Sequence, residues 1–155
     1  ESNMRMSEVI DDTLNLEPER IAVISGPNIA LEIAQEQPTG AVASCVDQDV
    51  AQEVAIACST SYFRTYVNTD VVGTELGGVL KNLIALAIGI VDGVGYGENT
   101  KAAIITRGLT EMTDFAVGLG ANPATMSGLA GLGDLVDEGL RFGARVAQGQ
   151  CRCAR

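Results

Sequence analysis

Apolar positions in the first 70 residues alternate between strand-like and helix-like spacing. Runs rich in β-branched residues predict three strands, at 20–25, 40–46 and 62–68. The segments between these strands have helical spacing and cover 27–36 and 47–58. Short links between a strand, a helix and the next strand are typical of a parallel sheet with helical crossovers. The pattern therefore predicts an α/β unit built on a parallel sheet.

Beyond residue 70 the pattern is helical throughout. It predicts a long apolar helix at 71–91, a glycine-rich loop at 92–99 and an amphipathic helix at 100–119. A compact segment with several glycines follows at 128–136, and a short helix at 140–148. We therefore expect two domains with a boundary near residue 70. Residues 1–70 form the α/β domain, and residues 71–155 form an all-helical domain.

Composition narrows the classes of function. The chain of 155 residues has a net charge of −10, and its ten Lys and Arg residues are scattered, so no nucleic-acid surface is expected. It contains no histidine, which removes His bases, His metal ligands and His-dependent triads. Cys45 and Cys58 lie among apolar residues, and the other two cysteines form a lone C-x-C. We therefore expect no metal site and a reduced, cytoplasmic protein.

The most apolar run of the chain is too short to cross a bilayer. Residues 83–91 are nine uninterrupted apolar residues, with Lys81 before them and Asp92 after them. We therefore expect no membrane span. The sequence does not open with a basic and apolar leader, so no secretion signal is expected.

Lys81 lies inside the long apolar helix, where burying an ammonium group is costly. Its helical neighbours at i−4, i−3 and i+4 are Gly77, Gly78 and Ala85, so its side chain crosses a floor of small residues. Two helical glycines cost about 1 kcal/mol each relative to alanine, which a close helix crossing or a ligand must offset. A desolvated lysine can act as a general acid or base, whereas one that snorkels to the surface carries no chemistry. Both interpretations stay open on spacing alone.

Two further segments place residues where ligands often bind. In "SGPNIA", Gly26 stands where a strand ends and a helix begins, and such positions face ligands in parallel α/β folds. In "AGLGDL", Asp134 follows three closely spaced glycines, and its carboxylate could accept hydrogen bonds from hydroxyl groups or an ammonium. The ordinary alternatives are a simple turn with Pro27 at the first helical position, and a helix N-cap at Asp134.

No glycine cluster of the sequence has the spacing of a dinucleotide-binding loop. The sixth position of a G-x-G-x-x-G match is Glu98 when counted from Gly93, and Thr100 when counted from Gly95. Neither lysine follows a glycine, so there is no P-loop. A dinucleotide-binding sheet needs its glycine fingerprint after the first strand. If the sheet is of this kind, the chain is expected to begin after that fingerprint.

Three segments together closely resemble the bacterial NAD(P)-dependent glycerol-3-phosphate dehydrogenases. They are "SGPNIALEIAQEQPT", "YVNTDVVGTELGGVLKNLIALAIGIVDGVGYGENTKAAIITRGLTEM" and "GLAGLGDLV", and the resemblance runs from Ser2 to Val136. It implies an α/β part followed by an all-α part: the second half of a Rossmann-type parallel sheet, then a helical substrate domain similar to that of 6-phosphogluconate dehydrogenase. It also implies that the protein interconverts dihydroxyacetone phosphate and sn-glycerol 3-phosphate with NAD or NADP, for glycerophospholipid synthesis, as a cytoplasmic homodimer.

The resemblance further implies roles for individual residues. Lys81 matches the lysine that donates and accepts the proton, and Asp134 matches an acidic residue that contacts the substrate and helps to orient that lysine. Gly26, Asn28 and Asn82 match substrate-binding positions, although Asn28 stands where Ser or Thr is common in the family.

The match to the family is partial at both of its ligand sites. Ala30 matches a position that lies against the cofactor, but the glycine fingerprint and an upstream lysine of the cofactor domain have no counterpart. After Val136 the family usually has a Ser-Arg-Asn segment that grips the phosphate, and "DEGLRFGARVAQG" stands there instead. Arg141 and Arg145 do not match the arginine of that segment. We therefore expect this chain alone to be inactive.

Two other functions remain open. A related NAD(P)-dependent reductase of a small 2-hydroxy or 2-oxo acid has the same architecture, although the "ENTKAAIITRG" match argues against it. A non-catalytic role, in which the helical half serves only as an oligomerisation module, is favoured for the isolated chain by the missing cofactor elements. A cofactor-binding titration separates this last role from the dehydrogenase.

Overall fold

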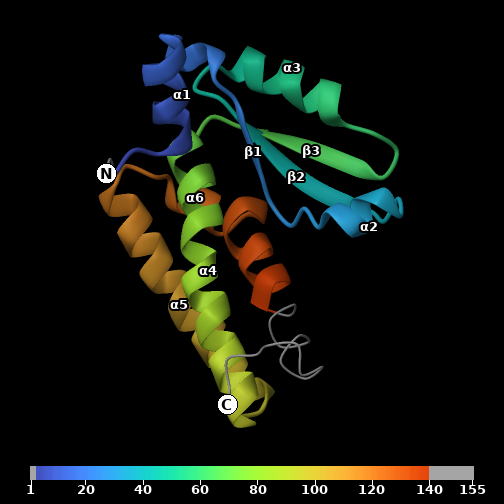
Figure 1. Ribbon diagram of the computed structural model, residues 1–155, viewed down its shortest axis with the longest axis vertical. Coiled ribbons are helices and arrows are strands. Elements are labelled where there is room, and N and C mark those ends of the chain that lie inside the picture. The colour runs from blue at the N-terminus through green and yellow to red at the C-terminus, as the bar shows by residue number, and fades with distance from the viewer. Residues whose placement is uncertain (1–2, 140–155) are drawn as a thin grey trace.

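The computed structural model describes residues 3–139, and the helix expected at 140–148 lies outside them. Figure 1 shows a small sheet with helices around it and a long pair of helices that extends away from the sheet. The elements are, in chain order, α1 (Met6–Leu14), a 3-10 turn (Pro18–Arg20), β1 (Val23–Ser25), α2 (Ala30–Ala34), β2 (Thr39–Ser44), α3 (Gln48–Cys58), β3 (Phe63–Asn68), α4 (Val71–Val94), α5 (Glu98–Gly118), α6 (Pro123–Met126) and a π-helical turn (Leu129–Gly133). This π turn leads into a helical stretch at 134–139.

The sheet is mixed, with its three strands in the order β1-β2-β3. β2 and β3 run parallel with α3 between them in the chain, as the strand–helix–strand pattern predicts. β1 runs antiparallel to β2, with Ser25 opposite Val42, so the expectation of a parallel sheet is wrong for this pair. The cause lies in the connection, because α2 has only five residues and cannot carry the chain back along the sheet as a crossover helix does. The broader expectation, the end of a Rossmann-type unit followed by helices, is confirmed.

The central strand β2 holds the core of the α/β part. Ala41, Ala43 and Cys45 have no exposed surface, and β2 contacts both α3 and the π turn. α3 begins where the sequence predicts, because the Asp47 carboxylate accepts hydrogen bonds from the backbone N–H groups of Asp49 and Val50 at 2.8 and 3.2 Å. The contact between β2 and the π turn holds the sheet against the segment that precedes Asp134.

α4 connects the sheet to the helical part. Asp70 caps its first turn by accepting a hydrogen bond from the N–H of Gly73 at 2.9 Å. The helix continues to Val94, so the loop expected at 92–99 shrinks to 95–97, because Gly95 ends the helix with a left-handed φ of 86°. α5 then returns alongside α4 (Figure 1). The core between the helices contains Leu76, Met112, Ala116, Ala121, Met126 and Leu135.

α4 is long and apolar enough to cross a membrane by length and composition alone. It has 24 residues and a mean hydropathy of 1.6 in its most apolar window, of which 22% is buried. The run at 83–91, on which the expectation of no span rests, is therefore only part of a longer helix. Core helices of water-soluble proteins that are mostly buried pass the same test, and α4 contacts α5, α6 and the π turn. We assign no membrane span on this basis.

The helical part begins at α4, but contacts cross the expected boundary near residue 70. Glu75 of α4 accepts hydrogen bonds from three donors of the N-terminal segment: Arg5 Nη1 at 3.1 Å, the Ser7 N–H at 2.8 Å and Ser7 Oγ at 2.5 Å. These bonds hold α1 on α4. The division into domains at residues 1–70 and 71–155 stays a prediction.

Candidate functional site

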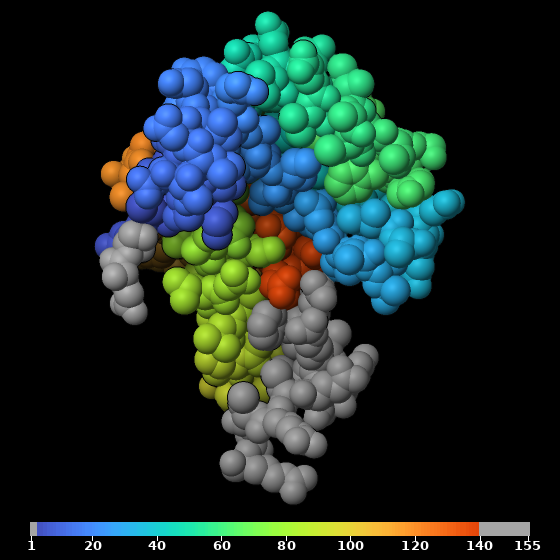
Figure 2. All heavy atoms as spheres, turned by 45° about the horizontal axis from the view of Figure 1, so that its top comes forward, coloured from blue at the N-terminus to red at the C-terminus, as the bar shows by residue number. Residues whose placement is uncertain are grey.

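A pocket of about 310 Å³ lies where β1, α4 and the end of the π turn meet. In Figure 2 the last described residues, in red, emerge between yellow-green α4 and the blue residues around α2. The pocket brings together side chains that are far apart in the sequence: Ile24, Ser25, Gly26, Asn28, Ile29, Gly78, Lys81, Asp134, Asp137 and Glu138. It therefore joins Lys81, Gly26, Asn28 and Asp134, four of the residues that the sequence singles out.

Lys81 and Asp134 form an ion pair at the floor of this pocket. The distance from Lys81 Nζ to Asp134 Oδ1 is 2.6 Å, across 53 positions of sequence. The exposed fractions of the two side chains are 16% and 4%, so Lys81 neither snorkels into solvent nor lies unpaired. Asp134 follows the π turn, and its carboxylate holds the ammonium group of Lys81.

The electrostatics of the pair are set mainly by burial. Desolvation raises the pKa of the Asp134 carboxyl above its ordinary value, and the hydrogen bond and charge of Lys81 oppose this rise. The carboxylates of Asp137 and Glu138 raise the Asp134 pKa further. A buried carboxylate so placed favours a positive partner or a hydrogen-bond donor beside it, which is what Lys81 provides.

The two glycines before Lys81 have different tasks. A Cβ on Gly77 would collide with the carbonyl oxygen of Ala130 in the π turn, so Gly77 allows α4 and the π turn to approach closely. A Cβ on Gly78 would point toward Ser25 Oγ and Asp134 Oδ2, which are pocket atoms. The cost of a glycine pair in a helix is therefore offset by a close helix crossing at Gly77 and by the close approach of the Ser25 side chain at Gly78.

Gly26 and Asn28 form the opposite wall. Gly26 has a φ of 133°, and a Cβ there would lie 3.3 Å from the backbone of both Gly40 and Ala41, so the turn after β1 requires glycine. The Oδ1 atom of Asn28 is buried and has no hydrogen-bond partner within residues 3–139. An unpartnered buried acceptor in a pocket wall is suited to a donor from a ligand.

Asn82 and Ala30 do not line the pocket. Asn82 is exposed, and its amide lies 3.4 Å from the carbonyl oxygens of Gly78 and Val79 in its own helix. One residue along a helix turns the side chain by about 100°, so Asn82 faces away from the direction of Lys81. Ala30 is exposed at the start of α2. Their expected roles in substrate and cofactor binding stay predictions.

Some lining residues were not assigned roles from the sequence. Ser25, Asp137 and Glu138 enter the pocket because β1 ends beside α4 and because the helical stretch at 134–139 turns once between Asp134 and the other two acids. The i, i+3 and i+4 spacing of the three acids was visible in the sequence and could have indicated a shared face. Among the described residues, no group of three or more His, Cys, Asp and Glu side chains could hold a metal ion.

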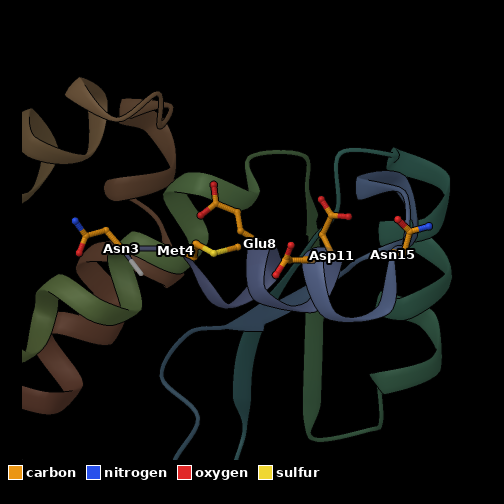
Figure 3. A pocket seen from close by; sticks show the side chains of 6 residues that line it. Asn3, Met4, Glu8, Asp11 and Asn15 are labelled. Carbon is orange, nitrogen blue, oxygen red and sulfur yellow. The ribbon is translucent and has the colours of Figure 1, made fainter. Parts of the chain in front are cut away.

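A larger hollow lies along α1. Its volume is about 650 Å³, and it is lined by carboxylates and amides of α1 and the residues before it (Figure 3). None of its lining residues is a cation or a nucleophile. It therefore offers acceptors without the acid–base pair that the pocket at Lys81 has.

The turn after β1 does not form a pyrophosphate cradle. Such a cradle is made of backbone N–H groups at a helix N-terminus. At the turn after β1, Pro27 removes one N–H, and α2 has only five residues. The residues at this turn therefore do not fit the pyrophosphate of a dinucleotide, and they face the small-molecule pocket instead.

Comparisons with known proteins show which family the chain resembles. The model of the NAD-dependent glycerol-3-phosphate dehydrogenase C-terminus matches residues 70–149, and that of the N-terminus matches residues 1–51. The glycerol-3-phosphate dehydrogenase [NAD(P)+] of Leifsonia xyli is 70% identical over 135 residues, which are 87% of this chain and 37% of the relative. That of Corynebacterium glutamicum is 51% identical over 156 residues, 96% of this chain and 47% of the relative.

The solved structures give the same result. The crystal structure of glycerol-3-phosphate dehydrogenase from Coxiella burnetii superposes with a TM-score of 0.82 at 38% identity, and the match covers 93% of this chain and 45% of that one. The chain thus spans less than half the length of the relatives it matches. From the matched family models, the sequence identity and the shared fold, we conclude that this chain belongs to the NAD-dependent glycerol-3-phosphate dehydrogenase family.

Proposed function

We propose that the protein interconverts dihydroxyacetone phosphate and sn-glycerol 3-phosphate, and that this chain supplies the substrate side of the site. The observation that carries the proposal is the buried Lys81–Asp134 pair, which shares one pocket with Gly26 and Asn28 in a chain of this family. The 2-hydroxy acid reductase alternative has no comparable support, because the family match covers both halves of the chain.

Lys81 supplies the proton of the reaction. When bound, the nicotinamide cofactor of the family would supply the hydride of the reduction, and negative charge would then develop on the carbonyl oxygen. The Lys81 ammonium stabilises this oxygen and protonates it to the hydroxyl, and the resulting neutral amine regains a proton from solvent. In the reverse direction the neutral amine takes the proton from the substrate hydroxyl.

Asp134 keeps Lys81 in place for this step. The hydrogen bond that Lys81 Nζ donates to the Asp134 carboxylate, at 2.6 Å, fixes the position of Nζ. Asn28 offers its unpartnered Oδ1 as an acceptor for a substrate hydroxyl. The lysine therefore has a fixed direction, and the substrate has polar contacts on two walls.

The phosphate end of the substrate is held elsewhere. Asp137 and Glu138 add carboxylates to the pocket, and Lys81 is the cation among its described lining residues. A phosphate dianion next to these acids is unfavourable, so it is directed toward the rim and away from the helical stretch at 134–139. The wider roles in glycerophospholipid synthesis, in the cytoplasm and as a homodimer belong to the same proposal, and they rest on family resemblance.

A ligand titration of the purified chain tests the proposal. We expect sn-glycerol 3-phosphate to shift the amide NMR signals of Gly26, Gly78 and Asp134, with a Kd on the order of millimolar because few polar contacts are available. Lys81→Met should abolish these shifts. Lys101→Met is the matched control, because Lys101 pairs with Asp92 and Glu98 at the far end of α4. Shifts that persist in Lys81→Met, or that are absent from the wild-type chain, would overturn the proposal.

A further inference from the structure

Gly78 lies in the pocket wall beside two side-chain oxygens. A Cβ at Gly78 would lie 3.2 Å from Ser25 Oγ, which is a tight contact, and 4.0 Å from Asp134 Oδ2. Gly77 meets backbone atoms of another element, whereas Gly78 meets these two side chains. The absent side chain therefore lets one hydroxyl and one carboxylate oxygen lie close to α4, and we call the part of the pocket between these two oxygens the gap.

Both oxygens are free to bind a ligand. Asp134 Oδ1 receives the hydrogen bond of Lys81, whereas no donor within residues 3–139 reaches Oδ2. Ser25 Oγ also makes no hydrogen bond to the described part of the chain, although it lines the pocket at the end of β1. A carboxylate can only accept, and a serine hydroxyl can donate, so the gap offers one acceptor and one donor.

We propose that this gap is a subsite for the terminal hydroxyl of the polyol phosphate, with Ser25 as a further substrate-binding residue; this rests on the function proposed above. The hydroxyl donates to Asp134 Oδ2 and accepts from Ser25 Oγ. A hydroxyl satisfies both oxygens at once, because it donates one hydrogen bond and accepts another, whereas a phosphate dianion has no proton to donate and is repelled by the carboxylate.

The position of Lys81 decides which hydroxyl enters the gap. The oxygen on the reacting carbon is bound to Lys81 Nζ, which in turn lies on Asp134 Oδ1. The hydroxyl on the adjacent terminal carbon is then directed toward the other oxygen of the same carboxylate. The two neighbouring oxygens of the substrate thus correspond to the two oxygens of Asp134. The oxygen on the reacting carbon is linked to Oδ1 through Lys81, and the terminal hydroxyl contacts Oδ2 directly.

A comparison of two ligands on the full 155-residue chain tests the subsite. The probes are sn-glycerol 3-phosphate and 1,2-propanediol phosphate, which lacks only the terminal hydroxyl, and both affinities are measured by NMR titration. We expect the wild-type chain to prefer the first by about 10-fold, and Ser25→Ala to reduce this preference to about 3-fold or less, since one hydrogen bond is lost. Ser127→Ala, at an exposed serine after α6, should keep the full preference.

A second variant separates binding from folding. Gly78→Ala places a methyl group 3.2 Å from Ser25 Oγ, so this hydroxyl must move, and alanine suits a helix better than glycine. Its amide spectrum should therefore stay that of a folded chain, while the preference for the hydroxylated ligand disappears. An unchanged preference in Ser25→Ala, or in a folded Gly78→Ala chain, would overturn the subsite alone. Failure of the wild-type chain to bind either ligand, or binding that Lys81→Met leaves intact, would instead overturn the proposed function.

Discussion

At the residue scale, the protonation of Asp134 sets the charge beside Lys81, because the Asp134 carboxylate is the hydrogen-bond partner of Lys81. Its pKa is raised by burial and by Asp137 and Glu138, and it is held down by the Lys81 ammonium. In Lys81→Met the opposing charge is gone, so the pKa of Asp134 should rise further. A pH titration of the carboxyl carbon of Asp134 by NMR measures both values. A midpoint below the ordinary value of about 3.9, or one that Lys81→Met does not raise, would contradict this electrostatic account.

The raised pKa of Asp134 also predicts how the free energy of unfolding depends on pH. A carboxyl whose pKa is higher in the folded chain binds more protons when the chain is folded. Its contribution to stability is therefore fully present below the pKa of the unfolded chain, and it is lost as the pH rises through the pKa of the folded chain. The free energy of unfolding of the wild type minus that of Asp134→Asn should therefore fall across this window. Urea unfolding below and above the measured midpoint tests the sign, and a difference that grows with pH would refute it.

Gly77 sets the spacing of two elements, α4 and the π turn. Gly77→Ala places a methyl group against the carbonyl oxygen of Ala130, a backbone atom that cannot rotate away. We expect a loss of about 3 kcal/mol in the free energy of unfolding, since backbone overpacking must move the π turn and with it Asp134. Gly118→Ala is the control, because a Cβ there meets nothing within 4 Å. It should be neutral or stabilising by up to about 1 kcal/mol, and equal losses in the two variants would refute the assignment.

Glu75 is the contact that holds α1 to α4. Its side chain is 11% exposed and accepts three hydrogen bonds from Arg5 and Ser7. Glu75→Ala leaves these donors without their acceptor and should lower stability by about 1–3 kcal/mol, with faster amide hydrogen exchange throughout α1. Glu98→Ala removes an 85% exposed carboxylate and should change stability by less than about 0.5 kcal/mol. Unchanged exchange in α1 after Glu75→Ala would show that other contacts hold it.

The whole molecule exposes an apolar stripe along α4. Val79, Leu83, Leu86, Ile90 and Val94 are each more than half exposed and lie on one face at intervals of three and four residues. We expect the chain to self-associate through this face, as unpaired apolar faces of this kind do. Analytical ultracentrifugation should find dimers or larger species that become monomers in the double variant Leu83→Glu, Leu86→Lys.

Ile56→Glu is the control for this association. Ile56 is 68% exposed on α3, away from the stripe, so its replacement should leave the self-association unchanged. A wild-type chain that sediments as a monomer at about 100 μM would contradict the expectation.

The parts of the fold that the sequence predicted are those with local causes. α3 follows from Asp47 and its helical spacing, and α4 follows from a long apolar pattern capped by Asp70. The direction of β1 was missed because it depends on the length of α2, which helical spacing overstated. The end of α4 was placed too early because Gly93 is accommodated in the helix and only Gly95 leaves it.

The candidate site was predictable only in part. The spacing around Lys81 indicated an open floor, and the glycines before Asp134 indicated a carboxylate able to accept from an ammonium. The pairing of these two residues across 53 positions was expected only through the family resemblance. Ser25 was missed because its role depends on the gap above Gly78, which exists only once β1, α4 and the π turn are packed together. Contacts between distant segments carry this information, and local periodicity does not.

At the scale of the whole enzyme, the central claim is that Lys81 transfers the proton. The direct test is a chimera in which this chain replaces the 135 matched residues of the Leifsonia xyli relative, which is 70% identical to it. NADH oxidation with dihydroxyacetone phosphate measures kcat, and Lys81→Ala should lower it by about 10²–10⁴-fold. The KM for NADH should change little, and Lys101→Ala should stay close to the parent chimera. An active chimera whose kcat survives Lys81→Ala would contradict the account.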